Sequence, residues 1–295
     1  MSIVTGRGFR LVSNSDRLSD AMIQHHVFEE VHYWQVARSY AGKHLYATGF
    51  FYLDSVMIDC GPNNMGGPLE KLFSGLNATK IIVTHHHEDH TGNLRQLLWK
   101  NGIECFAHPQ SEALLQQTCS EIPFYRRLIW GRPEPAAMTP IAQEMETSHY
   151  NFEVVPTPGH SQDHICLFER KKGWLFTGDL YLASYLRYLR EDENIYEIMN
   201  SLRKLIDLHP ALLFCNHRGF IAEGEKQLAK KLSFLEELRD QILRAHEEGV
   251  PVKDFINRLF RPDHFFRWLS QGEFSTINLI HAFLNQKRSC TAGQS

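Results

Sequence analysis

Four histidines gather in the segment IIVTHHHEDHTGN (residues 81–93), and their spacing is His85-x-His87-x-Asp89-His90. Imidazole and carboxylate groups are suitable ligands for zinc, iron or manganese. Burying so many polar side chains without such a partner would be costly. One short loop could offer His85 and His87 to one ion, and Asp89 and His90 to a second. The cluster therefore predicts a metal site, against the alternative of a chance histidine-rich loop in solvent.

Three further polar residues stand at the ends of apolar runs later in the chain. His160 ends the segment VVPTPGH, Asp179 ends WLFTGD and His217 ends LLFCNH. The histidine cluster also follows an apolar run, and open α/β sheets commonly bind ligands at the carboxyl ends of their strands. Taken singly, each of these three residues is more often structural than functional.

As a set, these residues resemble the signature of the metallo-β-lactamase superfamily. That family carries HxHxDH at a strand end, then a His after a Pro-Gly turn, a Gly-Asp pair and a last His, and this chain has all four pieces in that order. The similarity covers about residues 25–220. It implies an α/β fold of the four-layer αββα sandwich type, with a catalytic domain at residues 1–222 and a C-terminal helical extension at 223–295 packed on it.

The resemblance also implies two metal sites. The first ion would be held by His85, His87 and His160. The second would be held by Asp89, His90 and His217, with Asp179 bridging the two ions. A shared water would then lose a proton near neutral pH and attack the scissile bond, while Asp89 orients it or accepts a proton. The resemblance thus implies two divalent metal ions. Because no Cys belongs to the set, a hard or borderline ion is favoured, with zinc as the default and iron or manganese as alternatives.

The residues beside these ligands have narrower expected roles. His86 and Glu88 occupy the x positions and are expected to face away and shape the loop. Asp59, in MIDCG, matches the family's Asp before a Gly turn and is expected to hold a metal-binding His. His164 stands in GHSQDH, which is similar to a segment of thioesterase-like and ribonuclease-like members. It would either donate a hydrogen bond to the substrate or a ligand carboxylate, as a catalytic residue, or only pack.

Two stretches rich in aromatic residues could meet the substrate. YLASYLRYLR (residues 181–190) could reach the mouth of the site, where its arginines would meet an anionic substrate; the alternative is a solvated helix face. Residues 120–150 carry four prolines and are predicted to form a long excursion that could act as a lid. Its Phe124, Tyr125 and Trp130 would cover an apolar acyl group or form the small core of that loop.

Strand and helix patterns alternate before residue 217, which is typical of a layered α/β architecture. Strands are predicted at residues 27–37, 43–53, 55–60, 80–85, 103–108, 152–160, 164–170, 173–179 and 211–217, and helices at 68–76, 91–102, 109–119 and 197–209. From Glu223 to Gly249 apolar residues are spaced three and four apart, which predicts a long helix. Two shorter helices follow at 252–260 and 274–284.

Charge and composition limit the partners. The 31 Lys and Arg against 34 Asp and Glu give a net charge of -3, which argues against binding nucleic acid through a basic surface. No apolar run is long enough to span a bilayer, and the N-terminus shows no leader pattern. Six scattered cysteines without a CxxC pair favour a reducing compartment. We therefore expect a cytoplasmic protein that acts on a small molecule, with no membrane or nucleic-acid partner.

The favoured function is that of a binuclear metal-dependent hydrolase acting on an ester or thioester through a metal-bridging hydroxide, which resembles the glyoxalase II and thioesterase branches of the superfamily. One alternative keeps the metals and changes the substrate, as a lactonase or a phosphodiesterase and ribonuclease. The alternative of another class is a non-catalytic ligand-binding or regulatory protein on the same fold.

Overall fold

The computed structural model describes residues 9–10, 15–18, 21–40, 43–44, 46–260 and 264–291. The chain divides into two compact units. The first contains Met1–Pro156, Asp163–Leu182 and Pro210–Gly224, and the second contains Thr157–Gln162, Ala183–His209 and Glu225–Ser295. The domain boundary between residues 222 and 223 that the sequence predicts stays a prediction.

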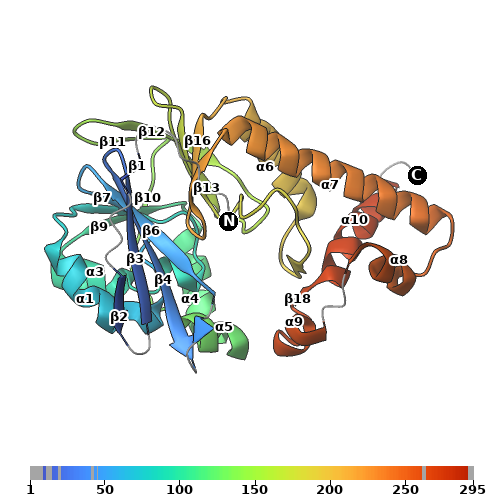
Figure 1. Cartoon of the computed structure of the whole chain (residues 1–295), viewed down its shortest axis with the longest axis horizontal. Helices are drawn as coiled ribbons and strands as arrows, with labels where there is room; N and C mark the ends of the chain where they lie inside the picture. The colour runs from blue at the N-terminus through green and yellow to red at the C-terminus, as the bar shows by residue number, and fades with distance from the viewer. Residues whose placement is uncertain are drawn as a thin grey trace. The chain divides into compact units, whose positions relative to one another are not determined.

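The first unit contains a large N-terminal sheet (Figure 1). Its main strands, in spatial order, are β1 (Phe9–Arg10), β3 (Ala21–Phe28), β4 (Val31–Tyr40), β6 (Thr48–Leu53), β7 (Val56–Ile58), β8 (Lys80–Ile82), β9 (Glu104–Ala107) and β10 (Thr139–Pro140), with β2 (Ser15–Leu18) beside β3 and β5 (Lys43–His44) beside β4. Pairing is antiparallel as far as β7 and parallel from β7 to β10. The parallel strands β7, β8 and β9 therefore end at the same edge of the sheet.

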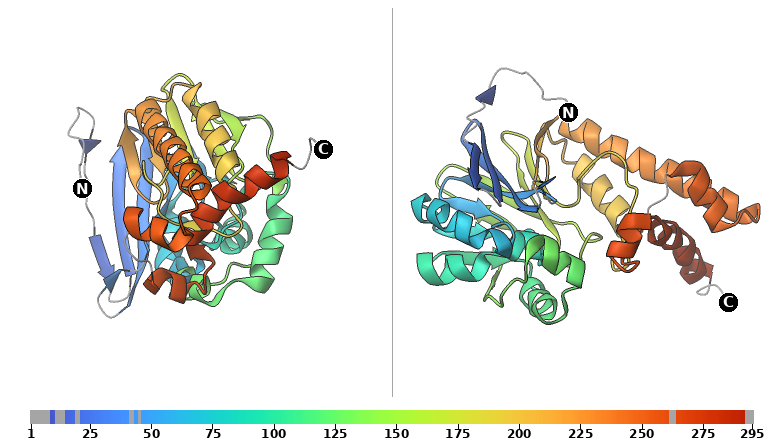
Figure 2. Two further views of the ribbon diagram at one scale, coloured as in Figure 1. Left: turned by 90° about the vertical axis from the view of Figure 1, so that its right-hand side faces the viewer. Right: turned by 60° about the horizontal axis from the view of Figure 1, so that its bottom comes forward.

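Helices cover one face of this sheet (Figure 2). They are α1 (Gly66–Gly75), α3 (Leu94–Asn101) and α4 (Ser111–Glu121), and the short η1 (Asn63–Met65), α2 (Glu88–Thr91) and α5 (Phe124–Trp130) lie in the same unit. An apolar core of fully buried side chains joins sheet and helices, with Phe50 and Met57 from the strands and Leu69, Phe73 and Leu97 from the helices. Burial of these side chains is the main term that fixes the helices on the sheet.

A second sheet belongs to the same unit. Its strands, in spatial order, are β11 (Glu144–Glu146), β12 (Asn151–Pro156), β13 (Ile165–Glu169), β14 (Trp174–Gly178), β16 (Leu212–Cys215) and β17 (Gly219–Ala222). The core between the two sheets is aromatic. Phe51 from β6 meets the rings of Phe176 and Phe214 edge to face, at centroid distances of 5.3 and 5.8 Å. The predicted α/β fold with two large sheets and helices is confirmed.

The second unit is mainly helical. It contains α6 (Ile195–Ile206), nearly all of α7 (Gly224–Glu247), α8 (Val252–Leu259), α9 (His264–Leu269) and α10 (Thr276–Thr291). The side chain of Asn194 starts α6 by accepting hydrogen bonds from two backbone N–H groups of the first turn. An Arg203–Glu236 ion pair at 2.6 Å links α6 to α7. None of the helices in the described ranges is both long and apolar enough to cross a bilayer.

Three local predictions differ from the structure. The strand predicted at 27–37 is a hairpin, because β3 ends at Phe28 and β4 begins at Val31, with Glu29 between them at a φ of +50°. The excursion at 120–150 is partly regular, since it contains α5, β10 and β11. Residues 181–190 do not form the helix of the solvated-face alternative; they are irregular up to β15 (Leu189–Arg190), which pairs with β18 (Phe274–Ser275).

Candidate metal centre

The HxHxDH loop follows β8 directly and lies in the interior of the first unit. Its His85, His87, Asp89 and His90 side chains are at most 5% exposed. Backbone N–H groups of His90 and Thr91 donate to the His87 carbonyl, which forms the first turn of α2. The strand ends and the helix begins within a few residues, so the ligating side chains are held by regular structure on both sides. Polar groups buried at this depth need partners.

Four sequence-predicted ligands come together within the first unit: Asp89, His90, Asp179 and His217. Each offers one ligand atom, and these atoms all lie within 4.8 Å of one another. Nε2 of His90 lies 3.2 Å from an Asp179 oxygen and 3.5 Å from an Asp89 oxygen, and among the described residues it is buried without a hydrogen bond. Nε2 of His217 lies 3.1 Å from Asp179 and 3.4 Å from Asp89. Two imidazoles and two carboxylates converging in this way suit a divalent cation.

The orientation of the His90 and His217 rings is set by contacts to their Nδ1 atoms. Nδ1 of His90 lies 2.8 Å from a carboxylate oxygen of Asp59, as expected for that residue. Nδ1 of His217 lies 2.7 Å from the backbone carbonyl of Ala47. Each acceptor requires the proton on Nδ1, which leaves Nε2 with the lone pair that a metal needs. Ala47 could not have been found from the sequence, because any residue carries a carbonyl.

Asp59 is itself held at three points. Its carboxylate accepts hydrogen bonds from the backbone N–H and the hydroxyl of Thr84, both at 2.8 Å, and from the Asn216 side chain at 2.7 Å. It also has a left-handed backbone, with a φ of +61°. A non-glycine residue in this region costs free energy and is retained only where its surroundings enforce it. The strain at Asp59 supports a role in fixing the site.

Charges in the centre compensate one another. Burial by itself lowers the pKa of His90, but the carboxylates of Asp89, Asp179 and Asp59 together raise it well above its usual value. Burial also opposes ionisation of Asp179, yet His217 and His90 hold the pKa of Asp179 well below its usual range. Two carboxylates are thus kept ionised in the interior by positive charge beside them, and a divalent cation can take the place of that charge.

The other predicted ligands are divided between the two units. Nε2 of His85 and Nδ1 of His87 face each other at 2.8 Å within the first unit, and Nδ1 of His85 lies 3.1 Å from the Thr84 hydroxyl. His160 belongs to the second unit, where it forms a close ion pair with Glu193. No pattern in the sequence points to Glu193.

The x positions of the motif shape the loop, as expected, with His86 partly buried and Glu88 fully buried. Nδ1 of His86 lies 2.8 Å from Asp163, which also accepts a 2.7 Å hydrogen bond from Ser111. The fully buried Glu88 carboxylate receives two hydrogen bonds from the Arg126 guanidinium of α5. Both partners come from parts of the chain far from the motif, and the sequence reasoning missed both.

His164 is fully buried, and its Nε2 accepts a hydrogen bond from the backbone N–H of Asp179 at 3.2 Å. Gly178 permits this close approach, because a Cβ there would lie 2.7 Å from Nε2 of His164. The contact positions Asp179, and a direct catalytic contact of His164 with substrate stays a prediction.

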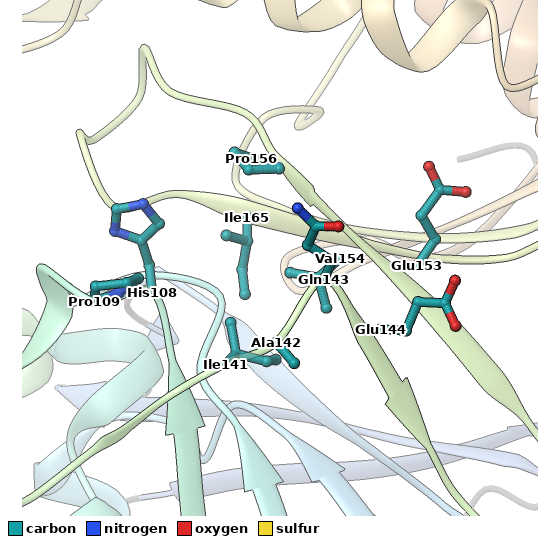
Figure 3. A pocket seen from close by; sticks show the side chains of 10 residues that line it. All are labelled: His108, Pro109, Ile141, Ala142, Gln143, Glu144, Glu153, Val154, Pro156 and Ile165. Atoms are coloured by element: carbon teal, nitrogen blue, oxygen red, sulfur yellow. The ribbon is translucent and has the colours of Figure 1, made fainter.

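A separate cavity of about 460 Å³ contains none of the predicted ligands (Figure 3). It is lined by His108, Pro109, Ile141, Ala142, Gln143, Glu144, Glu153, Val154, Pro156 and Ile165.

Comparison with known proteins decides the family. The family model described as the metallo-beta-lactamase superfamily matches residues 54–217, which is more than half of the chain and contains every predicted ligand. The chain belongs to the metallo-β-lactamase superfamily. Its cluster of histidine and aspartate ligands is that of a metal-dependent hydrolase using divalent metal, as the sequence predicts.

Individual relatives agree with this assignment. The chain is 29% identical to the beta-lactamase-like protein 2 homolog of Drosophila melanogaster over 70% of both chains. It is 27% identical to hydroxyacylglutathione hydrolase GloC of Haemophilus influenzae, over 55% of this chain and 81% of that one. Among solved structures, a beta-lactamase domain protein from Burkholderia ambifaria has a TM-score of 0.61 at 17% identity, covering 93% of this chain and 88% of the other. The last similarity shows the fold alone.

Proposed function

We propose that this metallo-hydrolase holds two divalent cations, with zinc as the default, and hydrolyses an ester or thioester bond. The observation that carries the proposal is the buried group of two imidazoles and two carboxylates, with Nε2 of His90 placed near carboxylate oxygens and without a hydrogen bond in the part of the chain that the structure describes. A group of this kind is costly to bury for structural reasons alone.

The first cation would be bound by His85, His87 and His160. His85 and His87 already present ring nitrogens to each other at 2.8 Å. The Thr84 hydroxyl donates to Asp59 and therefore accepts from Nδ1 of His85, which leaves Nε2 of His85 as a ligand atom. Glu193 would fix His160 in the same way, since its carboxylate accepts the Nδ1 proton and leaves Nε2 available.

The second cation would be bound by Asp89, His90 and His217, with Asp179 shared between the two. Divalent cations bound here would lower the pKa of water to about 7 and polarise the oxygen of the scissile group. The chain itself supplies fixed ligand directions, through Asp59 behind His90 and the Ala47 carbonyl behind His217. Asp89 is the carboxylate that would orient the attacking water.

The choice of a thioester or ester rests on the relatives. The hydrolases named for hydroxyacylglutathione are among the similar curated proteins, from Haemophilus influenzae and Prochlorococcus marinus.

A cytoplasmic location is part of the same proposal. Five cysteines in the described residues are free, and four of these are buried, which suits a reducing compartment.

The proposal is tested with protein loaded with zinc, iron or manganese and offered a thioester, an ester, a lactone and a phosphodiester. We expect metal-dependent hydrolysis of the thioester or the ester, abolished in His87→Ala and retained in Asp240→Asn, which changes a carboxylate on the surface. A fully loaded protein that cleaves only the phosphodiester would overturn the choice of substrate. A protein inert on all four would overturn the proposed activity.

A further inference from the structure

The helix α5 is fixed next to the metal loop through its backbone and its buried side. Arg126 binds the carboxylate of Glu88, the residue before Asp89. Near the helix end, the Asn64 side chain donates a 2.7 Å hydrogen bond to the carbonyl of Ile129. Gly131 closes the helix so tightly that a Cβ there would lie 2.9 Å from the backbone nitrogen of Asn64. The position of Trp130 relative to the loop is therefore set by several independent contacts.

A second aromatic side chain contacts the ring of Trp130. Tyr46 precedes Ala47, the residue whose carbonyl orients His217. The rings of Tyr46 and Trp130 lie 6.3 Å apart in an edge-to-face arrangement. Tyr46 is 53% exposed, so the pair is open on one side. Both rings are thus attached, through one or two fixed contacts, to residues next to the ligands Asp89 and His217.

Trp130 occupies this position at a cost. Its indole Nε1 is buried and makes no hydrogen bond within the described part of the chain. A buried N–H donor without an acceptor is destabilising, and a phenylalanine would avoid the loss. The position therefore retains the large indole face although the indole N–H is not satisfied. Large aromatic faces bind apolar groups, aromatic ones above all.

We propose that Tyr46 and Trp130 form an aromatic wall that binds an apolar group, best an aromatic ring, adjoining the scissile bond of the substrate. This inference rests on the proposed function. The group lies either on the acyl side or on the thiol side of the bond, because Trp130 is connected to the segment of Asp89 and Tyr46 to the contact of His217. Tyr46 and Trp130 are specificity-determining residues in this account, and they take no part in bond breaking.

Three thioesters test the wall: an acetyl ester of a small thiol, a phenylacetyl ester of the same thiol, and an acetyl ester of benzyl thiol. The measured quantity is the ratio of kcat/KM for each aromatic thioester to that for the small one. We expect Trp130→Ala and Tyr46→Ala to lower one of these ratios about tenfold. A lower ratio for the phenylacetyl thioester would place the apolar group on the acyl side, and a lower ratio for the benzyl thioester would place it on the thiol side. Trp130→Phe keeps an aromatic face and should keep most of the ratio.

Trp99→Ala is the matched control, because Trp99 on α3 is 85% exposed in the same unit and should leave both ratios unchanged. Tyr46→Ala removes an exposed side chain, so its result does not depend on whether Trp130→Ala folds. Ratios that stay the same in both wall variants would overturn the proposal. Ratios that fall equally in Trp99→Ala would also overturn it.

Failure of the wall can be separated from failure of the proposed function. If the metal-loaded wild-type protein hydrolyses neither the three thioesters nor the corresponding oxygen esters, the proposed function fails. The wall is then tested by calorimetry of phenylacetate and acetate binding to the same protein. We expect phenylacetate to bind about tenfold more tightly to the wild type than to Trp130→Ala. Equal affinity of phenylacetate for the two proteins would contradict the wall.

Discussion

Two groups of histidines in the first unit differ in their surroundings. His90 and His217 face carboxylates of Asp89 and Asp179 in the metal centre. His25 and His32, on β3 and β4, face each other, with Nε2 of His25 3.0 Å from Nδ1 of His32. The ring of His25 also stacks on Trp34 at a centroid distance of 4.4 Å. The first group meets acids and the second meets aromatic rings and another imidazole.

The difference in partners reverses the effect of burial on the pKa. Burial, together with the neighbouring His32 and His26, lowers the pKa of His25 to about 4. In the metal centre, carboxylates overcome burial and raise the pKa values of His90 and His217 well above the usual value. Crowding of histidines is therefore not by itself a sign of a metal site. Around His90 and His217, the converging carboxylates of Asp89 and Asp179 are what distinguish the metal centre from the His25 and His32 pair.

The largest effect is expected when a shared carboxylate is removed from the metal centre. Asp179→Asn keeps the shape of the side chain and removes its charge, so we expect kcat/KM to fall by about a thousandfold, the upper range for a single group that stabilises charge in an active site. The matched control is Asp240→Asn, in which a surface carboxylate next to Arg239 is neutralised. Steady-state kinetics on the responsive substrate would check this, and an Asp179→Asn protein with wild-type kcat/KM would remove Asp179 from the site.

The next largest effect, on the free energy of unfolding, is expected when the arginine that pairs with Glu88 is removed. Arg126→Met leaves the buried Glu88 carboxylate without its guanidinium, which should lower the free energy of unfolding by about 3 kcal/mol or more. Urea denaturation measures this loss. In the double variant Glu88→Gln and Arg126→Met the buried charge is gone, so we expect part of the stability to return. A single variant as stable as the wild type would show that Glu88 needs no partner.

A smaller effect, on metal affinity, is expected when the carboxylate that contacts Nδ1 of His90 is changed. Asp59→Asn removes the charge that orients the Nδ1 proton of His90, and residues in such a position typically change metal affinity by about 10-fold to 100-fold. Zinc affinity measured by competition with a chelator would show the weakening. Because Asp59 also accepts bonds from Thr84 and Asn216, thermal unfolding of the same variant is the control for lost folding. Unchanged zinc affinity in a folded variant would contradict the assigned role.

The smallest effect is expected in the other histidine group. The folded-state pKa of His25 lies below its unfolded value of 6.5, so the unfolded chain binds more protons between these values. The stability that His25 contributes is therefore complete above pH 6.5 and is lost as the pH falls toward 4. His25→Gln should reduce the loss of stability between pH 7 and pH 5 by a small amount, because water screens a half-buried ring. A variant with the same pH dependence as the wild type would argue against this neutral imidazole.

The sequence points to the candidate ligands because each one stands at the end of an apolar run. HxHxDH follows β8, and Asp179 and His217 follow β14 and β16, which lie side by side as parallel strands. The end of a buried strand is the one place where a run of apolar residues gives way to polar residues that still point inward. Asp59 is identified by its resemblance to the family's Asp before a Gly turn, and it lies directly after β7, where it contacts Nδ1 of His90.

Partners supplied by the excursion at 120–150 and by the segment before β6 could not be predicted. Arg126 stands 38 residues after Glu88, in a stretch where its neighbours show no pattern that favours a buried arginine. Trp130 and Tyr46 meet only in space. The turn at Glu29 was missed because two glutamates carry none of the usual turn signals, and only the pairing of β3 with β4 fixes the left-handed backbone there.

The central claim is that seven side chains hold two divalent cations. It is tested most directly by titrating zinc into metal-free protein and counting bound ions by native mass spectrometry. We predict two zinc ions per chain for the wild type, one for His87→Ala and one for His90→Ala. A wild-type protein that binds a single ion, or variants that both still bind two, would contradict the claim.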